Sequence, residues 1–192
     1  MSTLYKWITC EVTLKFKMNH NIWDEVIDAL SRIVKVYERG STAFGLFQDW
    51  SVRFKGLVEL LGNSSDNLCI IDLGAGPGTL EEVLSRHSKL TVHFDILPQM
   101  SLYAKTTHKH LQNVEYVIGV FEHLPFRRKA FDAAISSFSF RDARDKILAL
   151  REVARVVKNR YVVIDIGKPD NRVIELFELI YLKYLVPLIT SI

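Results

Sequence analysis

The spacing of apolar residues along the first part of the chain predicts a strand followed by helices. Apolar and polar residues alternate over 8–17, which is the period of a half-buried strand. Over 21–40 the apolar residues recur at helical spacing, and Gly40 is placed to end that helix. A second helix is expected near 48–62. These elements predict an N-terminal extension and helical cap over 1–62.

From residue 63 onward, short apolar runs alternate with helical segments. The runs lie at 68–73, 91–95, 114–119, 131–136 and 160–166, and the helical segments lie near 79–87, 98–110 and 143–157. Strands that alternate with helices imply parallel crossover connections and a sheet covered by helices on both faces. The expected fold class is therefore α/β, with a core over 63–192 that includes an apolar C-terminal helix near 171–186.

Composition and charge exclude several classes of protein. The chain of 192 residues is 48% hydrophobic and 24% charged, which is typical of one globular domain. The net charge of +3 is spread without a basic stripe, so no nucleic-acid partner is expected. The two cysteines and six histidines lack metal-ligand spacing, so no metal is expected. No signal peptide or transmembrane helix is recognised, which predicts a cytoplasmic protein.

The candidate chemistry lies in the loop after the first core strand, which reads Asp72-Leu73-Gly74-Ala75-Gly76-Pro77-Gly78. Glycines let the backbone approach a ligand closely, and free N–H groups at the start of the next helix attract an anion. Asp95 ends the next strand, where a carboxylate can accept both hydroxyls of a ribose. The glycines follow G-x-G-x-G rather than the dinucleotide pattern G-x-G-x-x-G, which disfavours a nucleotide-dependent dehydrogenase.

Further signals follow in a fixed order along the chain. They are Phe44-Gly45 with Trp50, Asp72 to Gly78, Asp95-Ile96 with Met100, Leu124-Pro125-Phe126 with Phe131-Asp132, Phe138 to Asp142, and Leu150-Arg151-Glu152 with Arg155 to Lys158 and Lys168-Pro169. Together they resemble the ubiquinone/menaquinone C-methyltransferase family of class I methyltransferases. The resemblance implies a Rossmann-like fold and S-adenosyl-L-methionine as the cofactor.

The resemblance also implies which residues bind the cofactor. They are Asp72, Gly74, Ala75, Gly76, Gly78, Asp95, Ile96, Met100, Val120, Phe121, Glu122 and Ser137. Asp72 would lie near the amino group of the methionine part, and Asp95 would hold the ribose. The family has an aspartate for the adenine amino group where this chain has Val120, so adenine recognition is expected to differ. Phe121, backbone groups or Glu122 would substitute.

On the acceptor side, the resemblance implies a small molecule, a quinol with an apolar tail, that is methylated at a ring carbon. Arg141 lies where the family's motif places an arginine near the substrate, and an arginine can bind a phenolate. The alternative for Arg141 is a salt bridge with Asp142 or Asp145. The aromatic residues near Trp50 are expected to form an apolar lid or to fasten the N-terminal helices to the core.

Several alternatives remain open at this point. The acceptor could be another small O- or N-nucleophile, because the fold hosts many chemistries. A non-catalytic, degenerate cofactor-binding scaffold is favoured by Val120, by the short segment 158–160 in place of the family's glycine-containing turn, and by the expectation that two C-terminal strands are missing. A homodimer and peripheral contact with a membrane surface are also left open.

Overall fold

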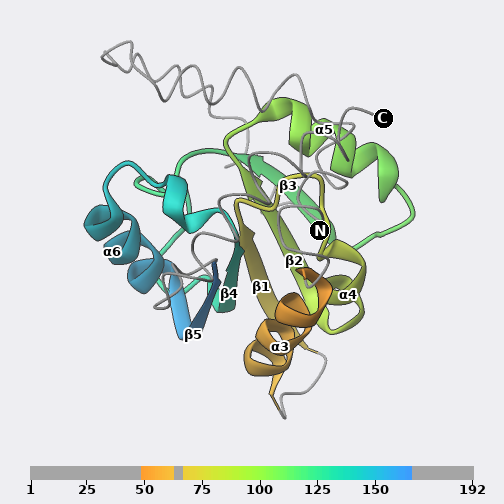
Figure 1. The fold of residues 1–192 in the computed structure, drawn as a ribbon, viewed down its shortest axis with the longest axis horizontal. Coiled ribbons are helices and arrows are strands. Elements are labelled where there is room, and N and C mark those ends of the chain that lie inside the picture. The colour runs from red at the N-terminus through yellow and green to blue at the C-terminus, as the bar shows by residue number, and fades with distance from the viewer. Residues whose placement is uncertain (1–48, 63–66, 166–192) are drawn as a thin grey trace, which may run out of the picture.

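A computed structural model describes residues 49–62 and 67–165 of the chain (Figure 1). The expected strand 8–17, helix 21–40 and C-terminal helix 171–186 lie outside the described residues. In the described part, no helix is long and apolar enough to cross a membrane. The elements are α3 (Asp49–Leu61), β1 (Leu68–Leu73), α4 (Glu81–Arg86), β2 (Ser88–Asp95), α5 (Pro98–Thr107), β3 (Val114–Ile118), β4 (Phe131–Ser137), a 3-10 turn (Phe140–Asp142), α6 (Lys146–Val156) and β5 (Val157–Ile164).

The five described strands form one sheet in the order β3-β2-β1-β4-β5, and every pair is parallel. After β1 the chain adds β2 and β3 on one side, and it then returns to place β4 on the other side of β1. The loops that follow β1 and β4 therefore diverge, which opens a crevice at the carboxyl ends of these strands. This order and the parallel pairing confirm the expected Rossmann-like α/β fold.

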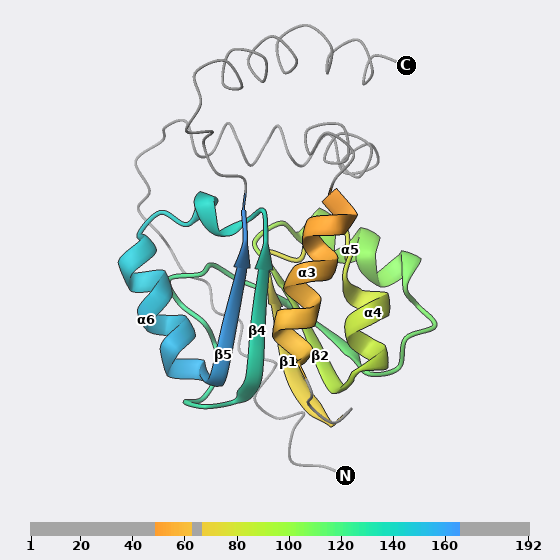
Figure 2. The ribbon, with the colours of Figure 1, turned by 60° about the horizontal axis from the view of Figure 1, so that its bottom comes forward.

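Helices cover both faces of the sheet (Figure 2). On one face, leucines of α3 and α4 pack with Ile70, Ala133 and Ile135 of the central strands. On the opposite face, Val153 and Val156 of α6 pack on a cluster that includes Ile71 and Phe94. Successive residues of β1 thus point into different halves of the core, which is why this strand is apolar on both sides.

The last described strand begins earlier than the apolar pattern predicts. Helix α6 ends at Val156 and β5 starts at Val157, so no loop separates them. Val157 already pairs with Phe131 of β4, and its backbone N–H still donates to the Val153 carbonyl. The sequence predicts that segment 158–160 replaces the family's glycine-containing turn. In the structure this segment is part of strand β5.

Helix α3 approaches β5 closely because Gly56 has no side chain. A Cβ atom at Gly56 would overlap the end of the Ile164 side chain, and α3 contacts both β4 and β5. We expect Gly56→Leu to lower the free energy of unfolding by about 1–3 kcal/mol, although leucine favours helix, because α3 must move off the sheet. Urea denaturation measures this change.

The matched control is Val58→Leu on the exposed side of the same helix, where the side chain is 52% exposed. This substitution should alter stability by less than about 0.5 kcal/mol. The double variant with Ile164→Ala should regain part of the loss caused by Gly56→Leu, because it frees space at the contact. Equal stability of the two single variants would refute close packing at Gly56.

Candidate functional site

The loop after β1 is a tight turn held against the end of β2. The backbone N–H groups of Gly74 and Ala75 donate to the Phe94 carbonyl at 2.7 and 3.2 Å. Gly74, Gly76 and Gly78 have φ angles of 72°, 58° and 85°, a region that side chains other than glycine rarely adopt. The turn therefore needs glycine at all three positions of the motif for its backbone shape alone.

Two of these glycines are also required by close neighbours. A Cβ atom at Gly74 would overlap the Ser139 side chain, which comes from the loop after β4. A Cβ atom at Gly78 would lie 2.8 Å from Cδ of Glu81 and 3.0 Å from Cβ of Ala104. The loop is thus packed between the turn after β4 and the helices α4 and α5.

Asp95 lies beside this loop with its carboxylate held in one orientation. Its Oδ2 accepts the Gly76 N–H and its Oδ1 accepts the Leu97 N–H, both at 2.8 Å. Burial raises the pKa of Asp95, and these two hydrogen bonds oppose that rise. Each carboxylate oxygen keeps a second lone pair. A fixed carboxylate of this kind can still accept two hydroxyl groups, as a ribose would require.

Asp72 is the most unfavourably placed charge in the crevice. The residue is 2% exposed, and its Oδ1 has no hydrogen-bond partner. Burial raises the pKa of its carboxyl group to about 7, while nearby His93 acts against the rise and Glu81 adds to it. A buried carboxylate that lacks a partner is costly and would be stabilised by a cationic ligand group. The site therefore fits the amino group of an amino-acid-like ligand.

The loop after β4 is fastened from α3 by a residue that sequence reasoning missed. Arg53 is only 6% exposed, and its Nη1 donates to the Ser137 Oγ at 2.8 Å. Its guanidinium also lies 4.9 Å from the centre of the Phe138 ring. Arg53 precedes buried Leu57 by four positions, so a charge on the buried face of α3 was the signal in the sequence. Through this hydrogen bond, Arg53 fixes the predicted site residue Ser137 relative to α3.

Ser139, also missed, joins the two loops of the crevice. Its Oγ donates to the Leu73 carbonyl at 2.9 Å and lies 2.8 Å from the Ser136 Oγ. Ser139 occupies the position of glycine in the family's F-G-L-R-N motif, which Phe138 to Asp142 resemble. This difference was the signal available in the sequence. A shift of the turn after β4 would therefore change the contacts of Gly74, the first glycine of the loop after β1.

The three predicted cofactor-site residues that follow β3 and Gly119 lie in different environments. The Phe121 ring packs edge-on against Phe140, with 5.7 Å between ring centres, and its Cζ is 3.5 Å from the position of a Cβ on Gly74. The Glu122 Oε1 accepts the Asp145 N–H at 3.0 Å, so it supports the start of α6. The Val120 carbonyl accepts the His123 N–H at 3.1 Å. Phe121 is thus the member of this trio that borders the glycine loop.

Ile96 precedes α5 and Met100 lies in its first turn, and both pack in one small apolar cluster. Met100 is 1% exposed and packs with Leu97, while Ile96 is only partly buried against them. Met100 therefore supports the turn from the core, and Ile96 is the residue of this pair with surface left to offer a ligand.

Arg141 makes an ion pair that sequence reasoning did not predict. Its Nη2 lies 3.0 Å from Asp165 Oδ1, beyond the end of β5, and the two side chains are 45% and 28% exposed. Asp145 instead caps α6, where its Oδ1 accepts the Ile147 N–H. An ion pair with this exposure contributes little stability. The guanidinium can therefore leave Asp165 for an anionic ligand at low cost.

Residues 49–62 and 67–165 contain no group of three His, Cys, Asp or Glu side chains able to hold a metal ion. The titratable groups around the crevice are instead Asp72, Asp95 and Arg53. They offer carboxylates for a cationic amine and for hydroxyl groups. This arrangement suits an amino-acid–nucleoside ligand such as S-adenosylmethionine.

Comparison with known proteins agrees with this geometry. The sequence profile of the family described as "Methyltransferase domain" matches residues 71–164. The demethylmenaquinone methyltransferase of Tropheryma whipplei is 28% identical over 165 residues, which cover 85% of this chain and 67% of that protein. The enzyme of the same name from Thermotoga maritima is 30% identical over 152 residues, 77% of this chain and 60% of that protein.

Among solved structures, a SAM-dependent methyltransferase from Aquifex aeolicus superimposes with a TM-score of 0.53 and 25% identity, over 62% of this chain and 65% of that one. The chain spans about two thirds or less of the length of these relatives. The range 71–164 matched by the family profile contains the glycine loop and the ends of β1, β2 and β4.

The buried Asp72 carboxylate makes stability depend on pH. The folded protein holds the Asp72 proton up to a pKa of about 7, against 3.8 for an ordinary aspartate. Because the folded state binds more protons between these values, stability falls as pH rises through this window. At pH 8 the full penalty applies, so Asp72→Asn should raise the free energy of unfolding by about 2–4 kcal/mol in urea denaturation.

Asp132, at the other end of β4, provides the control with the opposite sign. Lys158 and the Cys69 N–H lower the pKa of Asp132. Asp132→Asn should therefore reduce stability at pH 8. If Asp72→Asn destabilised the protein at pH 8 as Asp132→Asn is expected to do, ionisation of the buried Asp72 carboxyl would not be costly in the folded protein.

Proposed function

The chain contains a methyltransferase domain of the S-adenosylmethionine-dependent class, and from this premise we propose that it methylates a ring carbon of a small quinol. The observation that carries the proposal is the pair of buried carboxylates at the ends of β1 and β2, one with an oxygen that lacks a hydrogen-bond partner and one oriented by two backbone N–H groups. Relatives named demethylmenaquinone methyltransferases support the quinol as the acceptor.

On the cofactor side, each group of the crevice has one proposed task. Asp72 would pair with the amino group of the methionine part, and the N–H groups of the glycine loop would face its carboxylate. Asp95 would accept the ribose hydroxyls, with Ile96 and Phe121 packed against the adenine. S-adenosylmethionine supplies a methyl group bound to a positively charged sulfur. The protein residues align it and exclude water.

On the acceptor side, the turn after β4 would receive the quinol. A ring carbon becomes more nucleophilic when the neighbouring phenol loses its proton, and a guanidinium stabilises the resulting phenolate. Arg141 is suited to this role because its ion pair with Asp165 is partly exposed. Ser137 is held in place by Arg53, and it would border the same space.

A second candidate function is a cofactor-binding scaffold without turnover. It is favoured by the end of β3, where Val120 replaces a carboxylate and Glu122 is already bonded to the Asp145 N–H. Adenine recognition would then rest on Phe121 and backbone groups. Methylation of another small O- or N-nucleophile is distinguished from the quinol by product analysis. A cytoplasmic location, a homodimer and peripheral contact with a membrane surface remain part of the proposal.

Binding of the cofactor is the first test. Calorimetric titration of the wild-type protein with S-adenosylmethionine should give a measurable dissociation constant. Asp95→Ala should weaken it by roughly 1.5–3 kcal/mol, or about 10- to 150-fold, because two charge-assisted hydrogen bonds are lost. Glu115→Ala, on the exposed surface of β3, serves as the charge-matched control. Equal affinity of the Asp95→Ala variant would remove the carboxylate from the cofactor site.

A variant of Arg141 tests whether this residue contacts the methyl acceptor rather than the cofactor. Arg141→Ala should raise the KM for a demethylmenaquinol-type acceptor about tenfold or more, because a contact to the phenolate is lost. The same variant should bind S-adenosylhomocysteine as the wild type does. Arg144→Ala, nearby and exposed, is the control. A loss of cofactor affinity without an effect on the acceptor would assign Arg141 to the wrong side of the site.

A further inference from the structure

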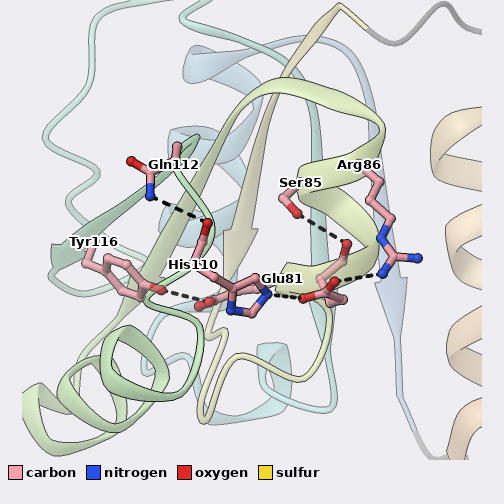
Figure 3. A network of polar contacts seen from close by, with 7 residues as sticks. Glu81, Ser85, Arg86, His110, Gln112 and Tyr116 are labelled. Carbon is pink, nitrogen blue, oxygen red and sulfur yellow. Dashed lines mark hydrogen bonds and ion pairs between the residues drawn. The ribbon is translucent and has the colours of Figure 1, made fainter.

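A largely buried group of polar side chains lies behind the glycine loop, and none of its members belongs to the sequence motifs. His93 of β2 and Glu81 of α4 are both 0% exposed, and the His93 Nδ1 lies 2.6 Å from the Glu81 Oε1. The His93 Nε2 lies 3.0 Å from the Ser101 Oγ of α5. The Tyr116 hydroxyl of β3 reaches Glu81 Oε2 at 2.8 Å, as Figure 3 shows. Four elements thus converge on one histidine–carboxylate pair.

This pair touches the cofactor site at two points. Glu81 packs under Gly78, where a Cβ would be 2.8 Å from its carboxyl carbon, and the Glu81 N–H donates to the Gly78 carbonyl at 3.0 Å. His93 is the register partner of Asp72 in the parallel pairing of β1 with β2. Side chains of register partners point to the same face of the sheet and lie side by side. His93 therefore stands between the Glu81 and Asp72 carboxylates.

The charges around Asp72 determine what His93 contributes. Asp72 is influenced by Arg53 from α3, Glu81 from α4, and His93 and Asp95 from β2. The Tyr161 hydroxyl of β5 is influenced by it in turn. Lys105 of α5 lies farther away, over the Tyr116 ring. His93 is bonded to Glu81 and interacts electrostatically with Asp72 and Asp95, so a positive charge on its ring would oppose all three buried carboxylates.

We propose that His93, held by Glu81, is a positioning residue that keeps the Asp72 carboxylate ionised and so sets the lower pH limit of cofactor binding. This inference rests on the proposed function, because it assumes that Asp72 meets the amino group of S-adenosylmethionine. An ionised Asp72 attracts this ammonium group, whereas a protonated Asp72 leaves it buried without a counter-charge. His93 does not touch the cofactor. It acts only through the charge on Asp72.

The test is binding of S-adenosylhomocysteine as a function of pH, measured by calorimetry between pH 5.5 and 9. This ligand carries the same amino-acid and ribose groups and has no methyl group to transfer. Wild-type binding should weaken as pH falls through about 7, the pKa of Asp72. In His93→Gln the midpoint should rise by about one pH unit, since the cation that favours the ionised form is gone. Affinity at pH 9 should stay within about threefold of the wild type.

Glu82 provides a matched control on the same helix. Its carboxylate accepts a hydrogen bond from Arg86 Nη2 at 2.7 Å and lies 2.9 Å from His110 Nε2, and its side chain is 38% exposed. Glu82→Gln therefore removes a histidine-paired charge without reaching Asp72, and it should leave the midpoint unchanged. A His93 that only supports the fold would weaken binding equally at every pH in His93→Gln, and an unshifted midpoint would overturn the proposal.

Two further measurements keep the inference separate from folding and from the proposed function. If His93→Gln does not fold, carbon NMR of the wild-type Asp72 carboxyl and the His93 ring reads both groups directly. A neutral His93 ring at the pH where Asp72 titrates would refute the proposal, and a charged ring would support it. Absence of wild-type binding at any pH would instead reject the proposed cofactor site. Wild-type binding with an unshifted variant would reject the role of His93 alone.

Discussion

Desolvation of the Asp72 carboxylate is the constraint around which the crevice is organised. The strand β1 lies in the centre of the sheet and is covered on both faces, so a charge at its end is removed from water by the same packing that stabilises the fold. Other parts of the site respond to this charge. Arg53 reaches it from α3 and His93 from β2, while Glu81 and Asp95 add negative charge. Positive charge close to Asp72 therefore stabilises the ionised form of its carboxyl group.

This constraint links stability to function. In the proposed function Asp72 meets an ammonium group, and the Asp72 oxygen that lacks a hydrogen-bond partner in the free protein lowers the stability of the fold until that ligand binds. Asp95 shows the other solution, because its two oxygens are oriented by the Gly76 and Leu97 N–H groups and still have lone pairs for hydroxyl groups. Asp72 and Asp95 carry the same carboxylate at adjacent strand ends, and they differ in the hydrogen bonds that surrounding groups provide.

The parts of the fold that follow from local pattern were predictable from the sequence. The apolar run at β1 and the three glycines specify their own conformation, since buried strands are apolar and positive φ angles favour glycine. The start of β5 was not predictable, because Val157 is both the C-cap of α6 and the first paired residue of the strand. The pairing of Arg141 with Asp165 and of His93 with Glu81 depends on register and helix position. Periodicity contains no information on either.

Ser139 explains why the two halves of the crevice cannot be treated as independent. Its hydroxyl donates to the Leu73 carbonyl, and its Cβ occupies the space that a side chain at Gly74 would need. Where the family's F-G-L-R-N motif has glycine, this chain has a hydroxyl whose hydrogen bond joins the turn after β4 to the end of β1. A displacement of either loop would therefore strain this contact. The departure of this chain from the motif strengthens the connection between its two loops.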